Sequence, residues 1–151
     1  MKRLTKPAGR YNLVIEEAPV PEPARDEVRI KAVRSLISRG SEMGARYTRE
    51  HAVSPDIMGY SMAGTIDAVG DGVAHFARGD RVVALAPHAE YTVRPATVAG
   101  PDGQSSVVAL PDDVSWDCAP YYPLAAGSVS WVGAEEIGPS DTVVILGQGL
   151  V

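Results

Sequence analysis

Short apolar runs, separated by glycine or proline turns at a spacing of roughly ten residues, constrain the fold of this chain more than any other feature. The runs have the length and composition of strands and occupy residues 13–17, 28–32, 61–69, 81–85, 90–94 and 107–110. In residues 28–32 apolar and charged side chains alternate, which is the period of a half-buried strand. The pattern predicts a mainly β domain, a barrel or a sandwich, that is finished by about residue 110.

A different pattern begins after Pro111. Ser115 is a good N-cap for a helix that runs through Ala119, and a second helix is expected from about residue 125 to residue 137. Residues 141–146 then end in a continuous apolar run without alternation, which is typical of a strand buried on both faces of a parallel sheet. The sequence therefore predicts that an α/β domain begins here.

Two glycines, Gly147 and Gly149, directly follow this expected strand. A glycine at the first position permits a tight turn, and a glycine at the second lets main-chain N–H groups approach a pyrophosphate. The pair matches the first part of a dinucleotide-binding fingerprint, whose third glycine would fall one residue past Val151. Taken alone, the segment is equally compatible with an ordinary strand followed by a glycine turn.

Composition excludes several classes of protein. The 151 residues carry a net charge of -5 with no basic stripe, so a nucleic acid is not an expected partner. Gly, Pro or a charged residue interrupts every long apolar stretch, and no apolar segment of a signal peptide follows the basic N-terminus, so we expect no membrane partner and a cytoplasmic location. Cys118 is the only cysteine, which rules out an internal disulfide and any multi-cysteine metal site.

Several segments, taken in order, resemble the medium-chain dehydrogenase/reductase superfamily, which contains zinc alcohol dehydrogenases and quinone reductases. No single segment is specific, but their order and spacing along nearly the whole chain match those of the superfamily. The segments are DEVRIK (26–31), PDIMGYSMAGTIDAVG (55–70), FARGDRV (76–82), HAEY (88–91), LPDDVS (110–115) and DTVVILGQG (141–149).

The resemblance implies a domain organisation. Residues 1–115 would form a GroES-like domain, a partly open β-barrel that carries the substrate side of the site. Residues 116–138 would be a helical connection, and residues 139–151 the first strand and turn of a truncated Rossmann domain. The strand at 141–146 would have no sheet partners within the chain, so it should leave apolar surface exposed.

The zinc ligands of the superfamily are missing at the positions that correspond to them by spacing. Those positions hold Ser38, Tyr60 and, for the third ligand, Tyr122. One hydroxyl and two phenols are poor substitutes for thiolate and imidazole. The remaining cysteine and histidines do not recreate a zinc site by their pattern: Cys118, His51, His75 and His88. We therefore expect no metal, and the chain resembles a zinc-lacking branch.

The loop LISRGSEM (36–43) supplies most of the candidate site residues. By resemblance, Arg39 would contact the cofactor pyrophosphate and Ser41 would relay a proton. Ser38, Ser41 and Tyr60 are hydroxyls that could stabilise negative charge on a substrate oxygen in place of zinc. The alternative for Arg39 is a solvated surface charge, that for Ser41 is a turn-forming hydroxyl, and that for Tyr60 is a packing aromatic.

The function implied for the full-length protein is hydride transfer between NAD or NADP and a carbonyl or an activated C=C of a small-molecule substrate. Gly147 and Gly149 would bind the cofactor, and a homodimer is the expected assembly of the full-length protein. Two alternatives remain open, a non-catalytic GroES-like binding module and a pseudo-enzyme that keeps the fold without turnover. The chain alone should be inactive, since it lacks most of the nucleotide domain.

Overall fold

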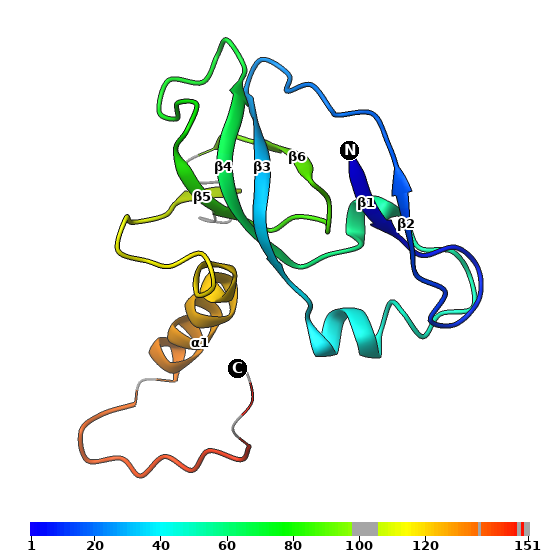
Figure 1. Cartoon of the computed structure of the whole chain (residues 1–151). Coiled ribbons are helices and arrows are strands. Elements are labelled where there is room, and N and C mark those ends of the chain that lie inside the picture. Colours follow the sequence, from blue (N-terminus) through cyan, green and yellow to red (C-terminus); the bar gives the residue numbers. More distant parts are fainter. Residues whose placement is uncertain (98–105, 136, 148, 150–151) are drawn as a thin grey trace.

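The computed structural model of the chain describes residues 1–97, 106–135, 137–147 and 149. Its centre is an antiparallel sheet in the order β6-β3-β4-β5-β7, which curls rather than lying flat (Figure 1). The predicted mainly β, partly open barrel is confirmed, and every strand of the sheet overlaps a run that the sequence singles out. The strands are β3 (Glu27–Leu36), β4 (Ser61–Val69), β5 (Arg81–Ala84), β6 (Tyr91–Pro95) and β7 (Val107–Ala109).

The curl of the sheet has a local cause in β3. Its register against β4 shifts at two points within residues 29–34. Irregularities of this kind bend a strand and increase its twist. Gly64 of β4 lies at the same place, and a Cβ there would collide with the main-chain oxygen of Lys31. The two long strands can therefore cross closely only because this position has no side chain.

The main hydrophobic core is formed by side chains from several strands of the curled sheet. Val28 and Ile30, two residues apart on β3, are both buried, as the alternation in residues 28–32 predicts. Burial of one such side chain stabilises a fold by about 1.5–3 kcal/mol. The buried cluster that they join contains Met62, Ile66, Val82, Ala84, Ala86, Ala96 and Val107.

A second, two-stranded sheet of β1 (Lys2–Thr5) and β2 (Val14–Glu17) packs beside the main sheet. The sequence predicts β2 but not β1, whose basic residues give no strand period. The Leu4 N–H donates to the main-chain oxygen of His88 at 2.8 Å, which ties β1 to the loop before β6. Lys6 follows β1 and is buried, with its Nζ donating to three main-chain oxygens. The N-terminal segment is thereby fixed to the loop of His88 and to the main chain at His51.

The helical region begins later than the sequence predicts. The Ser115 Oγ accepts the Cys118 N–H at 3.2 Å, as expected of an N-cap, but only a turn and the 3₁₀ turn η3 (Ala119–Tyr121) follow it. Pro120 has no N–H and therefore interrupts a helical ladder through this segment. The second predicted helix is present as α1 (Tyr122–Ala134), three residues earlier than expected at each end.

The strand predicted at 141–146 is not formed. These residues are exposed, with Leu146 94% exposed, and they pair with no strand in the described part of the chain. A strand needs main-chain partners on a neighbouring strand, which this segment does not meet. The helix α1, which projects away from the sheet in Figure 1, also carries several exposed apolar side chains. Across the described ranges, no helix combines the length and the apolar content that crossing a bilayer requires.

Arg81 fastens the connection between the sheet and the helices. Its Nη1 donates to the main-chain oxygens of Pro111 and Asp112 at 3.0 and 2.8 Å, and its Nη2 donates to that of Val114. The guanidinium carbon also lies 4.4 Å from the centre of the Trp116 ring. The planar fork of one arginine therefore holds the whole turn before η3.

Replacing this fork tests its contribution to stability. We expect Arg81→Lys to lower the free energy of unfolding by about 1–3 kcal/mol, because a lysine cannot donate to three carbonyls and stack on an aromatic ring. Urea unfolding of the 151-residue chain measures the change. The matched control is Arg78→Lys, whose side chain is 79% exposed and should have little effect. Equal stability of the two variants would contradict the assignment.

Candidate functional site

The loop that carries the predicted site residues forms a short π-helical turn, η1 (Arg39–Gly44), directly after β3. Ser38 begins this turn, and its Oγ accepts the Ser41 N–H at 3.3 Å. The Ser38 main-chain oxygen accepts the Glu42 N–H at 3.0 Å. Serine at an N-cap accepts main-chain donors in this way, so Ser38 and Ser41 are fixed next to each other.

Glu42 is the buried centre of this turn. Its side chain is 0% exposed and accepts three hydrogen bonds. The donors are the Ser38 N–H at 2.7 Å, the Tyr47 hydroxyl at 2.9 Å and the His88 Nε2 at 2.8 Å. Burying a carboxylate costs free energy unless the carboxylate is hydrogen-bonded. Here the donors come from the residue before η1, from the chain after η1 and from the distant loop of His88.

These contacts keep the Glu42 carboxyl ionised. Burial acts to raise its pKa, but the hydrogen bonds from His88, from Ser38 and from Tyr47 outweigh burial, so the pKa lies below its ordinary value of 4.5. Burial and the bond to Glu42 raise the pKa of the Tyr47 hydroxyl well above its ordinary value of 10.0. The phenol therefore remains a donor to the carboxylate.

His88 joins η1 to the start of β4. Its Nδ1 lies 2.9 Å from the Oγ of Ser35, an exposed residue near the end of β3. The His88 N–H donates to the main-chain oxygen of Met58 at 2.7 Å. Gly59 has a φ of +155°, and a Cβ there would lie 2.6 Å from the His88 nitrogen. The histidine loop and residues 58–59 thus pack main chain against main chain.

Tyr60 follows this close approach and is half-buried. The last paired residues of β3 and β4 are Leu36 and Ser61, so Tyr60 and the residues that lead into Ser38 leave the sheet at the same end. The Arg46 Nη1 donates to the Gly59 oxygen at 2.7 Å, which links the chain after η1 to the residue before Tyr60. The structure therefore brings the predicted hydroxyls to one end of the sheet.

The cofactor candidates are divided between two places. Arg39 is the first residue of η1 and its side chain is exposed. Gly147 has a φ of +98°, and nothing lies within 4 Å of a Cβ placed at Gly147 or Gly149. The two glycines are thus open and do not pack against η1.

Sequence reasoning missed the two residues that organise the site. Glu42 lies in the loop LISRGSEM without an assigned role, and the sequence pattern considers His88 only as a zinc ligand that it does not support. Because the two are 46 residues apart, no local pattern marks their contact. In the portion of the chain that the structure describes, no three His, Cys, Asp or Glu side chains are grouped to hold a metal ion.

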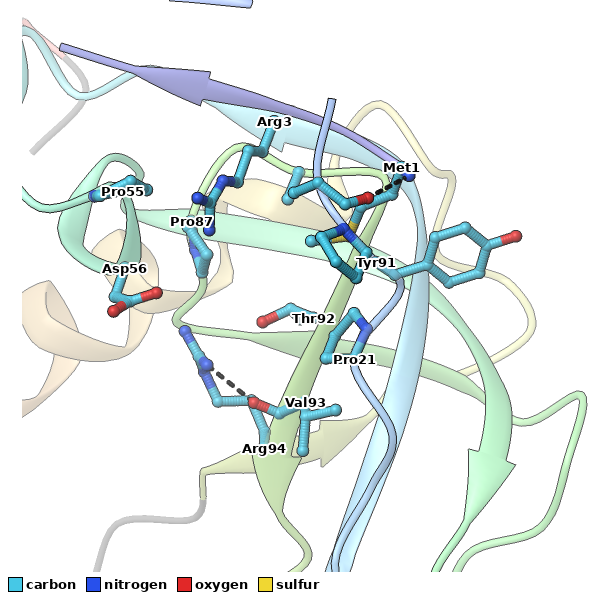
Figure 2. Close-up of a pocket in the computed structure, with 13 residues that line it drawn as sticks. Met1, Arg3, Pro21, Pro55, Asp56, Pro87, Tyr91, Thr92, Val93 and Arg94 are labelled. Atoms are coloured by element: carbon cyan, nitrogen blue, oxygen red, sulfur yellow. Dashed lines mark hydrogen bonds between the residues drawn. The ribbon is translucent and has the colours of Figure 1, made fainter. Parts of the chain in front are cut away.

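A separate pocket of about 330 Å³ lies between the N-terminal strand, η2 (Pro55–Ile57) and β6. Figure 2 shows the side chains of Arg3 and Arg94 on either side of Pro87 along its wall. Burial lowers the pKa of the Arg94 guanidinium. None of the predicted site residues lines this pocket, so it is distinct from the hydroxyl cluster.

Residues 24–114 match the family model described as the alcohol dehydrogenase GroES-like domain. The chain belongs to this family. The resemblance to medium-chain dehydrogenases and reductases that the sequence segments indicate is therefore confirmed. The match covers the candidate loop, the segment around Tyr60 and the loop of His88.

Two relatives in sequence are oxidoreductases by name. The acryloyl-coenzyme A reductase of Sulfurisphaera tokodaii is 31% identical over 85 residues, which are 56% of this chain and 25% of that protein. The alcohol dehydrogenase-like protein 6 of Arabidopsis thaliana is 37% identical over 73 residues, 48% of this chain and 18% of that protein. The chain thus matches only a minor part of each relative.

Solved structures extend the likeness in fold to almost the whole chain. The Escherichia coli quinone oxidoreductase complexed with NADPH has a TM-score of 0.69 at 23% identity, over 93% of this chain and 43% of that one. A mycobacterial protein complexed with NADPH has a TM-score of 0.65 at 25% identity, over 92% and 42%. The chain therefore spans less than half the length of the proteins with which it shares a fold.

The ionised state of Glu42 predicts a pH-dependent stability. Glu42→Gln should destabilise the chain by about 1–3 kcal/mol at neutral pH. The amide nitrogen of glutamine is a donor, and it would face groups that already donate to the carboxylate. A carboxyl whose pKa is lowered on folding stabilises the fold above its unfolded pKa and loses that contribution as the pH falls through the folded value. The difference between the two proteins should therefore shrink below about pH 4.5.

Urea unfolding of both proteins between about pH 3 and pH 8 measures this difference. Glu50→Gln is the matched control, since that carboxylate is exposed and lies 3.9 Å from Arg10. A stability difference for Glu42→Gln that stays constant over the whole range would contradict an ionised Glu42.

Proposed function

We propose that the chain is the substrate-side part of an NAD(P)-dependent oxidoreductase that transfers hydride between NAD(P)H and a carbonyl or an activated C=C. Membership of the alcohol dehydrogenase GroES-like domain family supports this proposal. So do the names of its relatives, an acryloyl-coenzyme A reductase and alcohol dehydrogenases. The observation that carries it is the turn η1, which Glu42 holds at the end of the sheet where both Ser38 and Tyr60 leave their strands.

We assign Arg39, Gly147 and Gly149 to the dinucleotide for their chemistry. Gly147 takes a positive φ and Gly149 leaves open space, so the main chain there can approach a pyrophosphate. Arg39 offers an exposed guanidinium suited to a phosphate oxygen. When bound, NAD(P)H supplies the hydride. The protein's own task is to orient the substrate and to balance the charge that develops on it.

Hydroxyl groups take up that task at the end of the sheet. Ser38 Oγ accepts the Ser41 N–H, which leaves its own proton free to be donated to a substrate oxygen. Ser41 is exposed and Tyr60 is half-buried, so each can offer a further O–H. Neutral hydroxyls are weaker than a metal ion at stabilising an oxyanion. The site therefore suits an activated acceptor, such as an enone or a quinone, better than a simple alcohol.

The remaining features of the full-length protein are proposals of the same kind. They comprise a division of this chain into residues 1–115, 116–138 and 139–151, a homodimeric assembly, a cytoplasmic location, and catalysis without zinc. The division is supported by the change from strands to helices between β7 and α1.

Turnover by the full-length protein tests the proposed function. Oxidation of NADPH and of NADH is followed with a quinone, an enone and a simple aldehyde, and alcohol oxidation is followed in reverse. We expect reduction of the quinone or the enone. Alcohol oxidation with no reduction of activated acceptors would contradict the preference for such acceptors. No turnover with any substrate would favour a binding module or a pseudo-enzyme.

Single hydroxyl deletions test the assigned roles. Ser38→Ala and Tyr60→Phe should each lower kcat for the preferred acceptor by about 10- to 1000-fold if that hydroxyl stabilises the oxyanion. Tyr11→Phe is a matched control, because the Tyr11 side chain is 59% exposed and lies outside the site. Wild-type kcat in both site variants would remove these hydroxyls from the mechanism.

A further inference from the structure

One loop contacts both halves of the proposed site. His88 donates through Nε2 to Glu42, which lies under the Ser38–Ser41 turn. The same loop packs against the main chain of Gly59, the residue before Tyr60. The loop of His88 is therefore placed to fix η1 relative to the start of β4.

We propose that His88 is a positioning residue, which acts through Glu42 to hold the hydroxyls of Ser38 and Ser41 in a fixed position relative to Tyr60. This inference rests on the proposed function for its catalytic consequence. It gives His88 a role through Glu42 rather than toward the substrate.

The hydrogen bonds of the imidazole define which nitrogen carries its proton. An ionised carboxylate only accepts, so Nε2 must carry a proton toward Glu42. Nδ1 faces the Ser35 hydroxyl, which can either donate to it or accept from it. The bond from Nε2 to Glu42 is therefore kept whichever role the Ser35 hydroxyl takes at Nδ1.

The surroundings of His88 leave Glu42 as its single acidic partner in the described part of the chain. The ring meets Ser35 from β3 and Glu42 from η1. The Tyr47 hydroxyl donates to the same Glu42 oxygen as His88 does. The Arg46 guanidinium donates instead to the main-chain oxygen of Gly59. The His88 side chain is 10% exposed. Removing the ring would therefore leave a buried carboxylate short of a donor.

Three variants of the full-length protein test the proposal. His88→Ala removes the donor. His88→Gln keeps one, because the amide nitrogen of glutamine can take the place of Nε2. His75→Gln is the control, since His75 is an exposed histidine outside the network. Each variant is measured for kcat and KM with the preferred acceptor, for the Kd of NADPH, and for amide hydrogen exchange.

For His88→Ala we expect kcat to fall by roughly tenfold to a hundredfold, the loss that corresponds to one hydrogen bond to a charged group. The Kd of NADPH should change by a smaller factor than kcat, because Arg39 is the only one of the three residues assigned to the cofactor that lies in η1. The amides of Ser41 and Glu42 should exchange at least about tenfold faster. His88→Gln should restore most of the kcat and of the protection, and His75→Gln should match the wild type.

Other outcomes would overturn the proposal. Wild-type kcat and wild-type exchange in His88→Ala would show that the turn does not depend on His88. Loss of kcat in His88→Ala without any change in exchange at the turn would contradict a positioning role. If His88→Ala does not fold, a folded His88→Gln with wild-type exchange supports the role, and a folded His88→Gln with an unprotected turn rejects it. If the wild type reduces no acceptor, the proposed function fails, while the exchange data still decide whether His88 holds the turn.

Discussion

The buried carboxylate of Glu42 is the interaction on which the proposed site depends. It collects donors from Ser38, Tyr47 and His88, which come from the start of η1, from the chain after it and from the loop before β6. An unpaired charge at this depth would cost far more than one hydrogen bond. The need to satisfy it therefore joins the start of η1, the chain after η1 and the loop before β6 at one point.

Glycine makes the same arrangement possible on the other side of the His88 loop. Gly59 lets the main chain before Tyr60 contact the His88 main chain directly, and Gly64 lets β4 cross β3 closely. The curl of the sheet and the placement of the loop thus follow from positions where a side chain would not fit. The sheet supports a site built from loops, which is the usual division between a rigid scaffold and functional loops.

Most of the fold could be predicted from the sequence, because alternating runs and turn residues report on local structure. The strands of the main sheet and α1 follow from such patterns, whereas β1 and η1 have no distinctive period. The segment 141–146 has the composition of a buried strand, but composition cannot provide the neighbouring strand that its hydrogen bonds require. In the site, Ser38, Ser41 and Tyr60 are candidates that the resemblance supplies, and their roles stay predictions. The contact between Glu42 and His88 could not be predicted, since it depends on the tertiary fold.

A crystal structure of the full-length protein with NADPH and an enone or a quinone tests the central claim most directly. The predicted result is a substrate oxygen within hydrogen-bonding distance of a hydroxyl of Ser38, Ser41 or Tyr60, above a buried Glu42 that still accepts from His88. A substrate oxygen bound to a metal ion, or a Glu42 turned out to solvent with η1 rearranged, would contradict it.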